Sequence, residues 1–257
     1  MSIKYYHLIV PDLHVPYHDH EALMSICKFA NQLSKKGLLN TFIVKGDFVD
    51  LYSMSQHGVK DPNLHNTLLD EIQECIITLD LMDKALGAHK KKVFMEGNHE
   101  HRLKRFIRNK AVELEGYFSL EERLMHCGKR KNWSYIPYTS DQLYKLQGTD
   151  LYVRHEPYGS SSQASIKNGM VSLNHGHDHK IHKTVLKNAE GKRIEVSSDG
   201  CLIDMKSPAF SYLKKFPTWT KGFGLVTVTT KGWFHQTIEI KNDHFVIGNK
   251  VYEIKRS

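Results

Sequence analysis

Three short apolar runs in the first hundred residues alternate with amphipathic stretches, and this alternation constrains the fold more than any other feature. Continuous apolar runs that end at turn-forming residues are typical of buried strands. The strands are expected at 6–10, 41–44 and 92–95. Apolar residues spaced by three and four positions predict the helices, at 20–35, 63–86 and about 100–113. Asp19 is expected to cap the first helix. Alternating strands and helices favour a layered α/β fold with a largely parallel sheet.

The second half of the chain is richer in strands than the first. Apolar and β-branched runs predict strands at 151–154, 171–174, 193–196, 225–228 and 236–240. The stretch 223–254 is nearly all β, with turn signals between its strands. We therefore expect a four-layer α/β/β/α sandwich with two packed mixed sheets, formed by one domain over residues 1–257.

Composition and charge narrow the class of protein. Of the 257 residues, 40% are hydrophobic and 25% are charged, which is ordinary for a globular protein and excludes collagen, coiled coil and wholesale disorder. No run of about 18 apolar residues exists, so no membrane span or membrane partner is expected. The formal net charge of +8 favours anionic partners such as nucleotides, nucleic acid or phosphorylated substrates.

Cysteine usage and the N-terminus predict a cytoplasmic protein. Cys27, Cys75, Cys127 and Cys201 form no CxxC pair, and a chain of this length needs no disulfide framework. Reduced, mostly buried thiols are therefore expected. The segment 1–7 lacks the basic start and the long apolar stretch of a signal peptide.

Polar clusters follow the predicted strands, and the chain carries 17 histidines. The clusters are, in chain order, Asp12 with His14, Asp47 with Asp50, Asn98 with His99, then His155, and last His177 with His179. In open α/β sheets, ligands bind beyond the carboxyl ends of the strands. Clusters that are far apart in the sequence are therefore expected to converge at that edge.

The chemistry of these side chains predicts a site for two metal ions. Carboxylates, imidazoles and one amide oxygen suit Mn²⁺, Fe or Zn²⁺ better than Ca²⁺, and the lack of cysteine ligands argues against a structural zinc. So many potential ligands are too many for one ion with an open position. They suit two ions that share a bridging ligand and lie about 3.5–4 Å apart.

The order of these clusters, DxH, GDxxD, GNHE, H and GHxH, resembles the calcineurin-like metallophosphoesterase family from Asp12 to His179. The resemblance implies ligands for two ions: Asp12, His14 and His179 for the first, Asn98, His155 and His177 for the second, and Asp47 for both. It implies that a hydroxide bridging the ions attacks phosphorus in line. His99 would face the leaving-group oxygen, and Asp50 would orient His99.

The chain departs from the family pattern next to one of these ligands. Glu156 follows His155 where the family commonly has glycine, so His175 and His126 remain alternatives at that position. Asp178, between the paired histidines, stands where a small residue is more usual. It is expected either to support a ligand from behind or to face solvent.

A second departure concerns substrate binding. Protein phosphatases of the family carry arginine directly after the second aspartate of GDxxD, but this chain has Leu51, which weakens that interpretation. Asn98, His99 and Arg102 are the candidate substrate-binding residues, although the basic stretch around Arg102 fits a solvated helix face equally well. Aromatic residues in predicted loops, such as Trp219, can stack a base or cover the core.

These observations predict a metal-dependent hydrolase of phosphoesters, acting on nucleotides or nucleic acid, with Mn²⁺, Fe or Zn²⁺ as the ions. Monoester and diester substrates remain equally open. Two alternatives are kept: a serine/threonine-type protein phosphatase, and a metal-free scaffold of the same fold that binds partners. A missing ligand is typical of scaffolds, whereas every ligand position is filled here.

Overall fold

The computed structural model describes residues 2–55, 67–87, 89, 91–126, 130, 132–157, 163, 167–210 and 218–256. Its first sheet has six strands: β1 to β4 are parallel to one another, β10 pairs antiparallel with β1, and β11 pairs antiparallel with β10. In spatial order the strands are β11 (Gly232–Glu239), β10 (Gly222–Thr229), β1 (Ile3–Val10), β2 (Leu39–Lys45), β3 (Lys92–Met95) and β4 (Trp133–Ile136).

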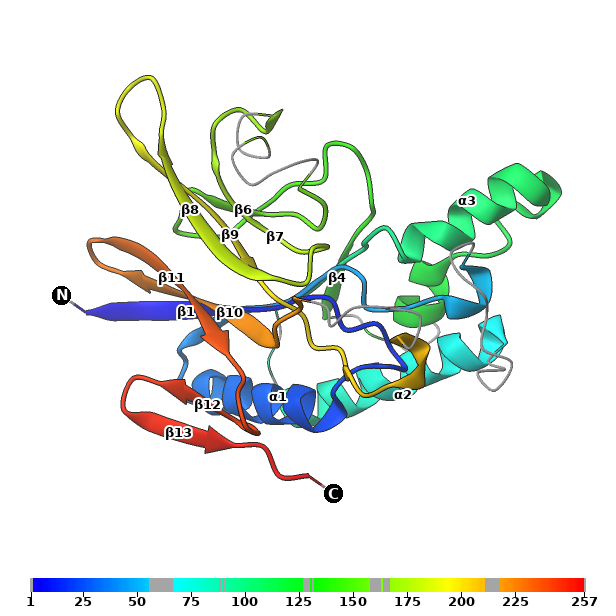
Figure 1. Ribbon diagram of the computed structural model, residues 1–257, viewed down its shortest axis with the longest axis horizontal. Helices are drawn as coiled ribbons and strands as arrows, with labels where there is room; N and C mark the ends of the chain where they lie inside the picture. Colours follow the sequence, from blue (N-terminus) through cyan, green and yellow to red (C-terminus); the bar gives the residue numbers. More distant parts are fainter. Residues whose placement is uncertain are drawn as a thin grey trace.

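A second, five-stranded mixed sheet lies on one side of the first (Figure 1). In spatial order its strands are β5 (Tyr144–Lys145), β6 (Leu151–Val153), β7 (Ser172–His175), β9 (Arg193–Asp199) and β8 (Ile181–Lys187). A separate hairpin is formed by β12 (His244–Ile247) and β13 (Lys250–Glu253). The predicted α/β fold with two packed mixed sheets is confirmed.

Helices cover the other side of the first sheet (Figure 1). They are α1 (His20–Lys35) and α2 (Leu68–Leu86), whereas α3 (Glu100–Lys110) follows β3. Asp19 caps α1 as expected, because its side chain accepts a hydrogen bond from the Ala22 amide at 3.1 Å. Thr67 and Asp70 form a capping box that starts α2.

Short helical turns connect these elements. They are the 3₁₀ turns η1 (Tyr52–Met54), η2 (Val112–Leu114) and η4 (Pro208–Phe210), and the π-helical turn η3 (Glu122–His126). Among the described residues, no helix is long and apolar enough to cross a membrane. Between β6 and β7, residues 158–162 and 164–166 lie outside the described part, so a helical fourth layer stays a prediction.

The central strands β1, β2 and β3 of the first sheet are largely buried on both faces, which explains their continuous apolar runs. Leu8 and Val10 on β1 pack toward the helices, whereas Ile9 packs against residues of the second sheet such as Leu151 and Val153. Successive strand residues point to opposite faces, so one apolar run serves two cores. This arrangement fixes how the carboxyl ends of β1, β2 and β3 approach the second sheet.

A buried polar network also joins the two sheets. Lys45, at the end of β2, is fully buried, and its ammonium donates hydrogen bonds to Asn174 Oδ1 and to the His175 carbonyl, both at 2.6 Å. Its Nζ lies 3.4 Å from Asp199 Oδ2. His235 of β11 contacts the other oxygen of Asp199 at 2.9 Å. Burial opposes ionisation, but His235 and Lys45 hold the pKa of Asp199 well below its usual range.

We predict that Asp199→Asn lowers the free energy of unfolding by about 3 kcal/mol, because it leaves the buried Lys45 ammonium without its counter-charge. Urea denaturation with a chelator present measures this cost without a contribution from bound metal.

The control is Glu239→Gln, which removes a solvent-exposed pair with Lys241 and should change stability by less than about 1 kcal/mol. Equal midpoints for the two variants would contradict the importance of the inter-sheet network.

Candidate metal centre

The chain turns sharply where it leaves the strands that carry the candidate ligands. Asp12, His14 and Asp47 have positive φ angles of 40°, 55° and 46°, and His177 and His179 have angles of 74° and 57°. Residues other than glycine rarely adopt positive φ angles, because the backbone is then strained. Such strain concentrates at functional sites. The turns aim these side chains at one place beyond the strand ends.

The first group of ligand atoms comes from Asp12, His14, Asp47 and His179. The Nε2 atoms of His14 and His179 lie 3.2 Å apart, and His14 Nε2 lies 3.8 Å from Asp47 Oδ2. His179 Nε2 lies 3.5 Å from Asp12 Oδ1. Asp12 Oδ2 is buried and has no hydrogen-bond partner among the described residues.

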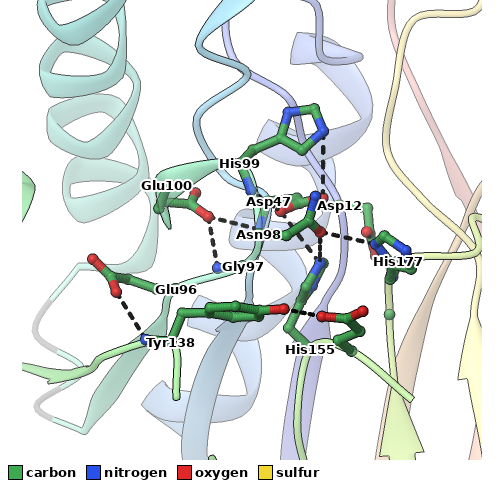
Figure 2. A network of polar contacts seen from close by, with 12 residues as sticks. Asp12, Asp47, Glu96, Gly97, Asn98, His99, Glu100, Tyr138, His155 and His177 are labelled. Atoms are coloured by element: carbon green, nitrogen blue, oxygen red, sulfur yellow. Dashed lines mark hydrogen bonds and ion pairs between the residues drawn. The ribbon is translucent and has the colours of Figure 1, made fainter. Parts of the chain in front are cut away.

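The second group comes from Asp47, Asn98, His155 and His177 (Figure 2). Asn98 Oδ1 lies 2.9 Å from His155 Nε2 and 2.8 Å from His177 Nδ1. His155 Nε2 also lies 3.2 Å from Asp47 Oδ1. Its Nδ1 faces the Lys45 carbonyl at 3.1 Å, so Nδ1 carries a proton and Nε2 is the atom available to a metal.

These residues fit two divalent cations. Each group combines imidazole nitrogens with carboxylate oxygens, the ligand set that Mn²⁺, Fe and Zn²⁺ accept. Asp47 is the residue common to both groups, and its two oxygens face different histidines. The unpartnered Asp12 Oδ2 and the close approach of two imidazole nitrogens are unfavourable without a cation and favourable with one.

Close backbone approach helps to hold this geometry. A Cβ atom on Gly97 would lie 2.1 Å from Asp47 Oδ1, and one on Gly176 would lie 2.6 Å from Asp12 Oδ2. Any side chain at these two positions would push a carboxylate out of place. The glycines of the GNHE and GHxH motifs therefore let the carboxylates sit directly against the backbone.

His99 and Asp50 stand beside the first group. His99 Nδ1 faces the Asp50 carbonyl at 2.7 Å and lies 3.3 Å from Asp50 Oδ1. The Asp50 carboxylate is closer to His14 Nδ1, at 2.7 Å. Asp50 thus contacts two histidines, of which only His99 was expected. By accepting from Nδ1 of His14, it leaves Nε2 of that ring facing the other ligands.

Arg102 reaches the site from the first turn of α3. Its Nη1 donates to the Asp50 carbonyl at 3.0 Å, and its Nη2 lies 2.8 Å from His99 Nε2. Arg102 thus contacts two site residues while its side chain stays partly exposed. Leu51, in contrast, is fully buried, so position 51 presents no side chain to the site.

Glu100 is a site residue whose role the sequence analysis missed. Its buried carboxylate accepts hydrogen bonds from the backbone amides of Asp47, Val49 and Gly97, at 3.1, 2.8 and 2.6 Å (Figure 2). It thereby ties the turn after β2 to the turn after β3. The position of Glu100 inside GNHE was a usable signal, because a buried glutamate needs such partners.

The alternatives for His155 lie elsewhere. His126, on η3, is exposed and belongs to neither group, and His175 belongs to a separate cluster with Asp178 and His182. Glu156 accepts a hydrogen bond from the Tyr138 hydroxyl. A glutamate after His155 is thus accommodated without entering either group. Trp219 lies edge-on to His179, with ring centroids 4.5 Å apart.

Comparisons with known proteins are sparse. No protein-family model matches the chain, and no curated protein matches it. It is similar to the solved structure of Vacuolar Protein Sorting 29 from Cryptosporidium parvum, 13% identical over 98% of this chain and 100% of that one, with a TM-score of 0.46. Vps29 from Chaetomium thermophilum is 12% identical over the same shares, with a TM-score of 0.47. Likeness at this level carries no conclusion about activity.

Electrostatics couple metal binding to proton release. Burial alone would lower the pKa of His155, but the Asp47 carboxylate outweighs it and raises this pKa to about 9. Burial likewise opposes ionisation of Asp47, yet His155 and His99 hold the pKa of Asp47 well below its usual range. At neutral pH the metal-free site therefore holds a proton on His155, which an ion must displace.

We predict that Mn²⁺ binds more tightly as pH rises from about 7 toward 9, by up to about tenfold per pH unit for one displaced proton. Calorimetric titration in two buffers with different ionisation heats counts the protons released for each ion bound.

The variant His155→Gln should no longer release this proton when the metal binds. The control variant His101→Ala should still release it, because His101, in the first turn of α3, belongs to neither ligand group. Binding that is independent of pH above 7 in the unaltered chain would contradict the assignment.

Proposed function

We propose that this chain is a dinuclear-metal phosphoesterase of the calcineurin-like metallophosphoesterase family. The observation that carries the proposal is the position of Asp47, a buried carboxylate whose two oxygens face two separate groups of ligand atoms. A bridging carboxylate is what holds two ions a few ångströms apart in two-metal hydrolases. The order of the five sequence motifs supports the same family.

The ligand roles follow the two groups. Asp12, His14 and His179 would hold the first ion, Asn98, His155 and His177 the second, and Asp47 both. Two divalent ions would supply an activated water and would neutralise charge on the phosphoryl group. The neutral amide of Asn98 keeps the site from becoming too negative for an anionic substrate.

His99 and Arg102 are suited to the leaving group and the phosphate. His99 Nε2 lies 3.8 Å from Asp47 Oδ2, so it borders the shared ligand without joining either group. Its other nitrogen is anchored at the Asp50 carbonyl, which fixes the ring. We assign His99 to donate a proton to the leaving-group oxygen. The Arg102 guanidinium, now beside His99, would turn to a phosphate oxygen when substrate binds.

A nucleotide or nucleic-acid phosphoester is the proposed substrate class. The net charge of +8 favours a polyanion, and Arg102 brings a cation to the site. Phe210 and Trp219 form an aromatic wall beside His179, with their ring centroids 5.7 Å apart. Such a wall can stack a nucleobase. The buried Leu51 gives no support to the protein-phosphatase alternative.

The test is a pair of rate assays with added Mn²⁺, one on an aryl phosphomonoester and one on the matching bis-aryl phosphodiester, each with a chelated control. Metal-dependent hydrolysis is expected, and the faster substrate separates a phosphatase from a phosphodiesterase. Absence of metal-dependent turnover on both esters and on a nucleotide panel would contradict the proposal and favour the metal-free scaffold.

We predict that His99→Ala reduces kcat by about 10²–10⁴-fold, the usual loss for a general acid, without reducing the number of ions bound. The matched control is His101→Ala, because His101 lies two residues further along, in the first turn of α3, and packs against Tyr138, 5.3 Å away between ring centroids. Steady-state kinetics and elemental analysis measure both effects. Unchanged kcat in His99→Ala would remove this residue from the mechanism.

A further inference from the structure

A third cluster of metal-binding side chains lies on the loop that follows β7. His177 and His179 belong to the two groups described above, whereas His175, Asp178 and His182 form a cluster of their own. One ligand atom from each of these three residues lies within 4.8 Å of the others. The cluster joins the end of β7, the loop and the beginning of β8.

His175 is held in the form that a metal requires. Its Nδ1 lies 3.0 Å from the Gly176 carbonyl, which can only accept, so Nδ1 carries the proton and Nε2 presents a lone pair. Nε2 is buried and has no hydrogen-bond partner among the described residues. A buried lone pair without a partner is costly unless something binds it.

Asp178 makes contacts through both of its carboxylate oxygens. One of its oxygens accepts a hydrogen bond from the Ser198 hydroxyl at 2.8 Å and faces the Lys180 amide at 3.3 Å. The other oxygen lies 2.6 Å from His182 Nε2. The hydrogen bond between Asp178 and His182 accounts for the orientation of those two side chains. It leaves the lone pair of His175 unexplained.

We propose that His175 Nε2, Asp178 Oδ2 and His182 Nε2 bind a single divalent ion such as Zn²⁺ or Co²⁺. Two imidazoles and one carboxylate are a ligand set that Zn²⁺ and Co²⁺ accept, with water in the remaining position. The side chains of Asp178 and His182 are 28% and 29% exposed, so solvent reaches the open side of the site. The hydrogen bonds from Ser198 and to the Gly176 carbonyl support the ligands from behind.

This third site is independent of the proposed hydrolase activity. Its three residues are distinct from the ligands assigned to the other two ions, although Asp178 lies between two of them in the sequence. An ion there would cross-link β7, the loop and β8, and so would hold the backbone that carries His177 and His179.

Uptake of Co²⁺ by the 257-residue chain, stripped of metal beforehand, tests the proposal through visible absorption and elemental analysis. The unaltered chain should retain one equivalent more than His182→Ala and one more than Asp178→Asn. Both altered residues are partly exposed, so these variants avoid the packing cost of replacing buried His175. His244→Ala, which removes a histidine of the β12–β13 hairpin, should match the unaltered chain.

The same difference is expected in a background that impairs the other site. Asp47→Asn should retain one equivalent more than Asp47→Asn combined with His182→Ala, whether or not the first two groups bind metal. Equal uptake by the unaltered chain and His182→Ala would overturn the third site. So would crystals soaked in Co²⁺ whose anomalous peaks lie only beside Asp47.

Discussion

The arrangement of the site depends on one buried carboxylate. Asp47 is almost completely inaccessible to solvent, yet it stays ionised because histidines surround it. Three backbone amides donate hydrogen bonds to Glu100, and these bonds hold the turn that carries Asp47 against the turn after β3. Gly97 supplies the space that the carboxylate fills. A buried charge is unfavourable unless positive partners compensate it. Protonated His155 is one such partner, and a metal cation can take its place.

Much of this organisation was predictable, because it follows from the local pattern of apolar and polar residues in the sequence. The bounds of α1 and β3 agree with the expected ranges, since Asp19 marks one start and a continuous apolar run marks the other. Convergence of Asp12, Asp47 and Asn98 was expected from strand polarity alone. The strand β8 was not predicted. It lies at the edge of its sheet, and its mixture of polar and apolar residues gives only a weak sequence signal for a strand.

Tertiary contacts decided what the sequence could not. The double role of Asp50, with His14 and His99, depends on where two loops meet in space. The orientation of Arg102 depends in the same way on how α3 leaves β3. The cluster around His175 was visible only as one alternative ligand, because residues 178 and 182 join it through the turn into β8.

The inter-sheet network around Lys45 has a mechanical consequence. Asp12, Asp47 and Asn98 follow strands of one sheet, whereas His155, His177 and His179 follow strands of the other. Two sheets joined by apolar side chains alone could slide a little at small cost. Here any sliding would strip a buried ammonium of its partners, so the sheets have one discrete alignment. The spacing between the two halves of the site is thereby set by residues behind it, of which Lys45 contacts the ligand His155 through its carbonyl.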